Sequence, residues 1–235
     1  MTSPQRAPDK SALRDAATVI LWRIGTDGAE VLMGTRGAGA AFMPNKVVFP
    51  GGAVDPGDAD VALAGIPPAP CLRRLAEAPR PGSGVTHTAL LAAAIREVWE
   101  ETGLILGRAA PPVAAPAPDW RSFAATGHRP DASAFRFVFR AVTPPGRPRR
   151  FDARFFLVPA KAVTGDPDDF SRASEELYYL QWVPLSRARS FDLPFITEVV
   201  LAEIAPLIAM GGGAPTEGVP HVRNDDIVSS VTRIA

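Results

Sequence analysis

Three glutamates within five residues are the feature of this sequence best suited to do chemistry. Glu97, Glu100 and Glu101 stand at positions i, i+3 and i+4, so a helix would carry all three on one side. Like charges at this spacing weaken a helix by roughly 0.2–0.5 kcal/mol per pair. Hard divalent cations take oxygen ligands, and Mg²⁺ commonly combines carboxylates with substrate phosphates. The spacing therefore indicates either a solvated helix face or a metal site.

The surrounding residues predict the helix that positions the glutamates. Thr86 or Thr88 can cap its start, and Gly103 can end it in the left-handed conformation. Apolar side chains recur at helical spacing in Leu91, Ile95 and Val98. We expect this face to lie in the core and the glutamates to lie on the opposite flank.

The segment from 96 to 104, Arg-Glu-Val-Trp-Glu-Glu-Thr-Gly-Leu, resembles the second half of the Nudix box. That box, G-x5-E-x7-R-E-U-x-E-E-x-G-U with U aliphatic, is the signature of hydrolases that cleave a diphosphate linked to another moiety. Residues 49–58, which begin Phe-Pro-Gly-Gly, resemble the first half. Asp58 stands in the place of the first glutamate, and the seven-residue spacer has become residues 59–95.

Three features are similar to one branch of that superfamily, the organellar coenzyme A diphosphatases and their bacterial relatives. The first is the long insertion inside the box. The second is the Thr-Pro…Arg-Arg-Phe-Asp-x-x-Phe run at residues 143–156. The third is Glu-x4-Gln-Trp at residues 176–182. The resemblance implies hydrolysis of coenzyme A or acyl-coenzyme A into 3′,5′-ADP and a phosphopantetheine product.

The resemblance also implies roles for individual residues. Mg²⁺ or Mn²⁺ would be held by the three glutamates and by the carbonyl of Gly51. Glu97 could also be the base, and Arg96 would fix Glu97 by a charge-assisted hydrogen bond. Glu176, next to Glu175, is the expected ligand or base outside the box. Arg36 and Gly52 are the candidates for substrate binding.

The pattern of elements predicts an α/β fold, and the resemblance implies a Nudix-type α/β/α sandwich with a mixed sheet. We expect one domain over residues 1–235, with an insertion at 59–85 and a tail at 211–235. The expected strands are 17–23, 31–36, 47–49, 135–142, 150–158 and 177–183. The expected helices are 71–78, 92–101 and 195–209, the last ending at the glycines 211–213.

Composition excludes several other classes of function. The chain has 25 basic and 25 acidic residues, so it has no overall attraction for nucleic acid or anionic membrane. No apolar run approaches the length of a membrane span, and residues 1–15 lack the features of a signal peptide. The single Cys71 excludes an intramolecular disulfide and suits a reducing, cytoplasmic location. The three histidines lack zinc-ligand spacing.

Two classes of function remain. A diphosphatase could act on coenzyme A derivatives, or on ADP-ribose or another nucleoside diphosphate derivative. A non-catalytic Nudix-fold regulator could bind such a ligand without turnover. A small-molecule diphosphate is the expected partner, and a homodimer is left open. Arg73, Arg74 and Arg80 in the insertion could face a substrate phosphate as a lid, or the insertion could be a surface decoration.

Overall fold

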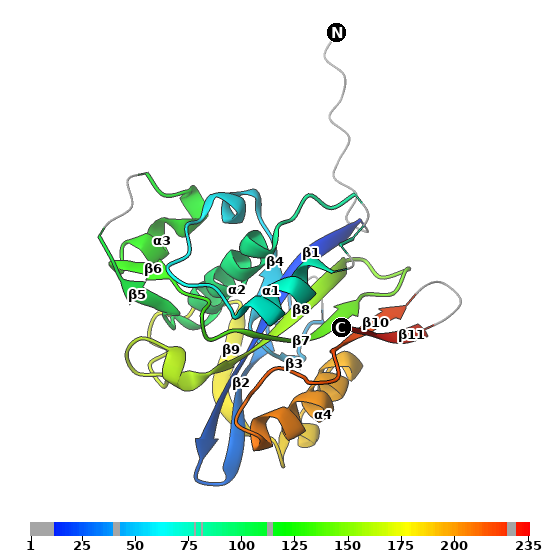
Figure 1. The fold of residues 1–235 in the computed structure, drawn as a ribbon. Coiled ribbons are helices and arrows are strands. Elements are labelled where there is room, and N and C mark those ends of the chain that lie inside the picture. Colours follow the sequence, from blue (N-terminus) through cyan, green and yellow to red (C-terminus); the bar gives the residue numbers. More distant parts are fainter. Residues whose placement is uncertain (1–11, 40–42, 78, 81, 112–114, 225–228) are drawn as a thin grey trace.

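The long strand β1 (Leu13–Gly25) organises the sheet of this protein (Figure 1). The computed structural model describes residues 12–39, 43–77, 79–80, 82–111, 115–224 and 229–235. The main sheet has nine strands in the order β11-β10-β7-β8-β1-β2-β3, with β4 paired to β1 and β9 paired to β2. The other strands of this sheet are β2 (Gly28–Arg36), β3 (Val47–Val48), β4 (Gly51–Ala53), β7 (Arg136–Val142), β8 (Arg150–Pro159), β9 (Leu177–Pro184), β10 (Val219–Asn224) and β11 (Ser229–Ile234).

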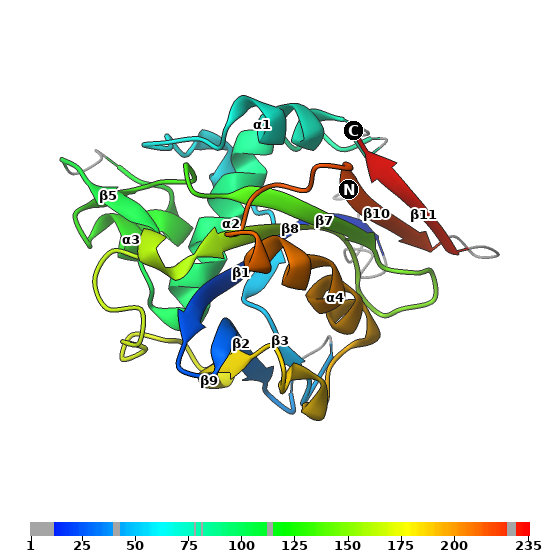
Figure 2. The ribbon, with the colours of Figure 1, turned by 60° about the horizontal axis from the view of Figure 1, so that its bottom comes forward.

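Helices cover both faces of this mixed sheet. Helices α1 (Ala69–Ala76) and α2 (His87–Thr102) lie on one side, and α4 (Phe195–Ala209) lies on the other (Figure 2). Beside α2, the short helix α3 (Arg121–Ala124) accompanies the small antiparallel pair β5 (Gly107–Ala109) and β6 (His128–Pro130). The described residues also include the 3₁₀ turns η1 (Pro56–Asp60), η2 (Pro118–Trp120), η3 (Ala160–Ala162) and η4 (Ala188–Ser190).

Alternation along β8 explains why the sheet has a helix layer on each face. Phe156 and Val158 belong to the apolar cluster that includes α2, whereas Phe155 and Leu157 belong to the cluster that includes α4. Successive strand residues point to opposite faces, so an apolar run without polar interruptions needs cover on both sides. The predicted α/β sandwich with a mixed sheet is confirmed.

Most predicted elements are present, with bounds shifted by a few residues. The tail is a strand pair, β10 and β11, joined to the sheet through parallel pairing of β10 with β7. The short pair of β5 with β6 and the strand β4 were not predicted, because two or three residues carry too little periodicity. Position 78 of the expected insertion helix and positions 112–114 lie outside the described residues. Among the described residues, no helix is long and apolar enough to cross a membrane.

A buried ionic network joins three strands to the insertion. Arg140 of β7 donates to both oxygens of Asp152 at 2.8 and 2.7 Å, and Arg154 donates to Asp15 at 2.6 Å. The other oxygen of Asp15 accepts a hydrogen bond from Arg80 in the insertion at 2.6 Å. Burial raises the pKa of Asp15, but these donors outweigh burial and hold that pKa below its usual value. The network therefore anchors the insertion on β1.

We expect Asp152→Asn to lower the free energy of unfolding by about 3–5 kcal/mol, because two arginines would remain buried without their shared carboxylate. The side chain of Asp152 is 1% exposed. Asp192→Asn is the matched control, since Asp192 also pairs with a cation, Lys46, but its side chain is 69% exposed. Its loss should stay below about 1 kcal/mol. Urea denaturation compares the two variants, and equal losses would contradict a structural role for this network.

Candidate active site

Helix α2 carries the clustered glutamates through the middle of the protein. Its start is capped by Thr86, whose side-chain oxygen accepts from the amide of Ala89 at 3.1 Å, and it ends at Gly103 with φ of 74°. The helix is buried on nearly every side, including Glu97 and Glu101, which are 8% and 0% exposed. The expectation that the glutamates lie on a flank away from the core was therefore wrong, because β4 and the turns around it pack over that flank.

Three carboxylates from two distant segments converge beside this helix. Glu97, Glu101 and Glu176 each offer one oxygen, and these oxygens all lie within 4.8 Å of one another. Glu176 directly precedes β9 and is exposed, whereas the two helix residues are buried. The cluster is thus open to solvent on the side of Glu176. Such a group of oxygen donors suits a hard divalent cation.

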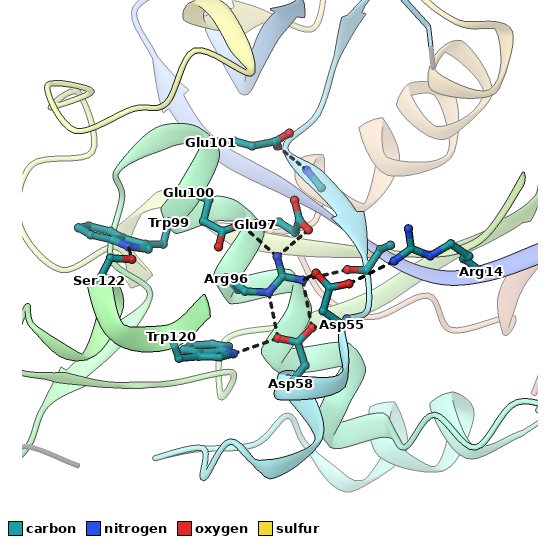
Figure 3. A network of polar contacts seen from close by, with 12 residues as sticks. Arg14, Asp55, Asp58, Arg96, Glu97, Trp99, Glu100, Glu101, Trp120 and Ser122 are labelled. Carbon is teal, nitrogen blue, oxygen red and sulfur yellow. Dashed lines mark hydrogen bonds and ion pairs between the residues drawn. The ribbon is translucent and has the colours of Figure 1, made fainter. Parts of the chain in front are cut away.

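Glu100 points elsewhere. Its carboxylate accepts from a guanidinium nitrogen of Arg96 at 3.0 Å, and Glu100 is not part of the three-carboxylate group (Figure 3). Its side chain is 36% exposed. Spacing alone placed Glu100 beside Glu97 and Glu101, but a cation one turn earlier on the same helix attracts it.

Arg96 is the centre of the polar network drawn in Figure 3. One nitrogen donates to both Glu97 and Glu100, at 2.9 and 3.0 Å, and another donates to the carbonyl of Ala53 at 2.9 Å. Burial alone would lower the pKa of Arg96, but the carboxylates around it hold that pKa above its usual value. The contact with Glu97 is the one that the sequence predicted.

Asp58 anchors Arg96 from the other side. Its two oxygens accept a forked pair of hydrogen bonds from Arg96, both at 3.0 Å. It also accepts from the indole of Trp120 at 3.0 Å and from the amide of Asp55 at 2.8 Å. Asp58 is fully buried. The residue in the place of the first box glutamate therefore positions Arg96 and does not face the solvent side of the cluster.

The two glycines of β4 lie directly against the glutamates. The amide of Gly51 donates to Glu101 at 2.8 Å, which places Gly51 beside the carboxylates, and its carbonyl remains a predicted metal ligand. A Cβ at Gly52 would lie 2.4 Å from a carboxylate oxygen of Glu97. Only glycine permits this approach of the backbone. Both residues thus shape the glutamate cluster.

Arg36, a predicted substrate-binding residue, lies at the end of β2 and contacts Glu101. The distance from its guanidinium nitrogen to the carboxylate oxygen is 3.3 Å, and its side chain is 22% exposed. The structure therefore brings Arg36 to the cluster, with part of its guanidinium still open to solvent.

Burial and the crowding of these acids raise three pKa values. Burial, then the neighbouring charges of Glu100 and Glu176, raise the pKa of Glu97 to about 7 against the opposing effect of Arg96. Burial and the charge of Glu97 raise the pKa of Glu101 to about 8, although Arg36 and the amide of Gly51 oppose the shift. Burial also raises the pKa of Glu100, against the charge of Arg96. Burial therefore disfavours the charged form of these carboxyl groups more than their local partners favour it.

Two tyrosines beside Glu176 were missed by the sequence reasoning. Tyr178 and Tyr179 are 45% and 81% exposed, and Tyr179 has φ of 52° at an irregularity in the pairing of β9 with β2. The ring of Tyr178 lies over Gly37, where a Cβ would come within 3.0 Å. Adjacent aromatic residues within a strand pattern were the available signal, but strands are rich in tyrosine for packing reasons alone.

Other singled-out residues have packing or anchoring roles. The indole of Trp99 donates to Ser122 at 2.9 Å, and Arg23 lies 4.2 Å from the ring centre of Trp182. Cys71 is buried. Arg74 donates to the carbonyl of Pro215 at 2.7 Å, and Arg80 is bound to Asp15. The expectation that these two arginines face a substrate phosphate was wrong, because they fasten the insertion to the rest of the fold.

Known proteins share this fold. No family sequence profile matches the chain. A Caenorhabditis elegans protein named nudix hydrolase 7 is 29% identical over 185 residues, which are 74% of this chain and 52% of that protein, so the chain spans about half the length of this curated relative. A NUDIX hydrolase from Alicyclobacillus acidocaldarius is 33% identical, with a TM-score of 0.61, and the match covers 85% of this chain and 96% of that one.

An Ap4A hydrolase from C. elegans has a TM-score of 0.48 and 15% identity, over 84% of this chain and 99% of that one. The identity to the Alicyclobacillus protein extends over nearly the whole length of that chain. Together with the glutamate-bearing helix and the Gly-Gly strand against it, this identity decides the family. The chain belongs to the Nudix hydrolases.

Proposed function

We propose that this protein is a divalent-metal-dependent diphosphate hydrolase. The observation that supports it most directly is the convergence of Glu97, Glu101 and Glu176 within 4.8 Å on a solvent-open side of the fold. Residues 1–235 would form a single domain, a proposal supported by the incorporation of both tail strands into the main sheet. A purely regulatory role is less well supported, because repelling carboxylates contribute nothing to ligand binding without a cation.

The residues present fit a divalent cation of the Mg²⁺ or Mn²⁺ type. All three donors are carboxylate oxygens, which hard cations prefer. Burial, together with the charges of neighbouring carboxylates, raises the pKa values of Glu97 and Glu101, and a bound cation would favour their charged forms. The amide of Gly51 already holds one oxygen of Glu101, which leaves the other near Arg36 and the open side. Glu100 would be a further ligand of the cation, because its carboxylate is partly exposed and could exchange Arg96 for the cation.

A divalent cation bound there would polarise diphosphate oxygens and lower the pKa of a bound water. Glu97 would accept the proton of the attacking water, a role that the family resemblance implies. Arg96 holds Glu97 in place, and Asp58 holds Arg96. Arg36 would bind a phosphate oxygen with the part of its guanidinium that remains exposed. Glu176 would serve as ligand or base from the opposite strand.

Coenzyme A or acyl-coenzyme A is the substrate class that we favour, with ADP-ribose or another nucleoside diphosphate derivative as the alternative. The insertion in the box and the sequence runs at 143–156 and 176–182 support the first. Tyr178 and Tyr179 support an adenine-containing substrate in either case, because their exposed rings lie within three residues of Glu176 and base stacking contributes about 1–3 kcal/mol per base.

One activity screen distinguishes these substrates. The purified protein would be offered coenzyme A, acyl-coenzyme A, ADP-ribose, NADH and diadenosine polyphosphates, with Mg²⁺, with Mn²⁺ and with chelator. Metal-dependent release of 3′,5′-ADP from coenzyme A with the highest kcat/KM is the expected result. A preference for ADP-ribose would select the alternative, and no turnover of any substrate would overturn the hydrolase proposal.

Glu101→Gln should lower kcat by a factor on the order of 100, because it removes one anionic oxygen donor without changing side-chain size. Glu198→Gln, an exposed glutamate in the first turn of α4, is the control and should leave kcat unchanged. Steady-state assays at saturating Mg²⁺ compare the two, with circular dichroism to verify folding. Wild-type turnover in a folded Glu101→Gln protein would exclude a metal-binding role.

Glu176→Gln should lower kcat more than it raises KM, because a ligand or base at the reacting water acts on the barrier and not on ground-state binding. Its neighbour Glu175 is exposed like Glu176 but is not part of the carboxylate group, so Glu175→Gln is the matched control. If both variants behave as wild type while Glu97→Gln is inactive, Glu176 has no part in the reaction.

Without metal, the protein should lose stability as pH rises from about 5 to about 8. Glu97 and Glu101 have folded-state pKa values above the unfolded value of 4.5, so the folded state binds more protons than the unfolded state across this range. The free energy of unfolding therefore falls as these protons dissociate. The double variant Glu97→Gln with Glu101→Gln should show a smaller loss. Thermal unfolding in EDTA measures it, and Mg²⁺ at pH 8 should raise Tm of the wild type alone. An unchanged pH slope in the double variant would refute this assignment.

A further inference from the structure

A second hollow lies away from the glutamate cluster. It has a volume of about 440 Å³, within the range of small-molecule sites. It forms where β1 runs parallel to the end of β8, with Trp22 opposite Pro159, and Gly211 and Gly212 after α4 complete its lining. Gly51 of the metal-facing strand pairs with Thr18, four residues before Trp22 on β1, so the two sites are roughly 13 Å apart along this strand.

The wall of this hollow is cationic. Arg23, Arg136 and Lys161 line it, and no aspartate or glutamate does. Arg23 is neutralised by Glu30 and Asp168. In the described part of the chain, neither Arg136 nor Lys161 forms an ion pair, although the formal net charge of the protein is zero. The hollow therefore concentrates positive charge that the protein itself does not balance.

The geometry of Arg136 prepares it to bind an anion. One guanidinium nitrogen, Nη1, donates to the carbonyls of Ser133 and Phe135 at 3.1 and 2.9 Å. This anchoring fixes the plane of the group while its other nitrogens remain available. Planar, pre-organised guanidinium groups bind phosphate oxygens well because less side-chain entropy is lost on binding.

The apolar part of the wall adds a second recognition element. The indole of Trp22 lines the hollow under the turn, and a Cβ at Gly212 would lie 2.3 Å from its ring. The indole N–H of Trp22 is buried and has no hydrogen-bond partner among the described residues. Ile24, 68% exposed, stands on the rim. A ligand with a phosphate and a flat or apolar body would match this combination.

We propose that this hollow is a second ligand site, which binds a small phosphate monoester or free phosphate between Arg136 and Lys161 and against Trp22. The ligand chemistry differs from that of the glutamate cluster, since direct cationic contacts replace a metal-bridged one. The site does not depend on the proposed hydrolase activity, so it can be tested in the presence of EDTA. The chelator removes the cation through which the glutamate cluster would bind an anion.

The test follows the indole N–H signals of protein labelled with ¹⁵N-tryptophan. The chain has four tryptophans, and Trp22→Phe assigns the signal of interest. Inorganic phosphate and adenosine monophosphate are titrated separately in EDTA. We expect a saturable shift of the Trp22 signal and none for Trp99 and Trp120, which report on α2 and Asp58. Tighter binding of adenosine monophosphate would identify an organic phosphate as the ligand, and equal binding would identify free phosphate.

Variants decide whether the cations carry the binding. The double variant Arg136→Gln with Lys161→Gln should weaken binding at least about tenfold, the effect of 1.4 kcal/mol. Lys161→Gln alone, at an exposed position, should weaken it about threefold and guards against misfolding of the double variant. Arg73→Gln, an exposed cation on α1, is the control and should bind as wild type. No shift of Trp22 at millimolar ligand, shifts of Trp99 and Trp120 alone, or equal affinity of all variants would overturn the proposal.

Discussion

The buried guanidinium of Arg96 is the constraint on which the rest of the site depends. Arg96 is 3% exposed, and its guanidinium binds Asp58 of η1, the carbonyl of Ala53 in β4 and two glutamates of α2 itself. A buried charge of this kind is tolerated only when every neighbour is placed to compensate it. Asp58 therefore has to be fully buried, and Trp120 and the amide of Asp55 complete the shell around that carboxylate. The position of Glu97 follows from this chain of contacts.

The glutamate cluster has the opposite character, because its negative charge is left partly unbalanced. Arg96 donates hydrogen bonds to Glu97 and Glu100, while Arg36 and the amide of Gly51 donate to Glu101. Burial nevertheless raises the pKa values of these glutamates. Perturbed carboxyl groups at an accessible place are typical of functional sites, which supports the proposed divalent cation. Glu100 would then have two alternative positions, on Arg96 or on the cation.

The insertion illustrates how a fold accommodates extra chain without disturbing its site. The insertion runs from η1 to the start of α2. Within it, Arg80 binds Asp15 and Arg74 binds the carbonyl of Pro215. Asp15 also accepts a hydrogen bond from Arg154. Asp152, which lies with Arg154 in the run at 143–156, accepts hydrogen bonds from Arg140. The sequence run at 143–156 thus contributes to a structural ionic network. Closing such a loop costs little entropy, and buried ion pairs with several donors keep it in one place.

Local signals in the sequence determined much of this protein. The Thr86 cap, the Gly103 stop and the 3.6-residue period define α2, and uninterrupted apolar runs define the central strands. The segment at 96–104 and the Phe-Pro-Gly-Gly run at 49–52 pointed to the family, and the glutamate spacing predicted a metal site. These features depend on neighbours within a few residues, so they can be read without knowledge of the fold.

Only the tertiary structure decided which charges meet. It placed Glu176 beside Glu97 and Glu101, and it paired Glu100 with Arg96. It also buried Asp58 and left Tyr178 and Tyr179 exposed beside the cluster. It also bound Arg74 and Arg80 within the fold and left Arg136 and Lys161 around the second hollow. Apart from the Arg96–Glu100 pair within α2, the hydrogen bonds among these residues join positions 38 to 141 residues apart, and their partners are selected by strand order and packing. Neither leaves a periodic signal in one sequence, because an ion pair depends on distance in space and not on spacing along the chain.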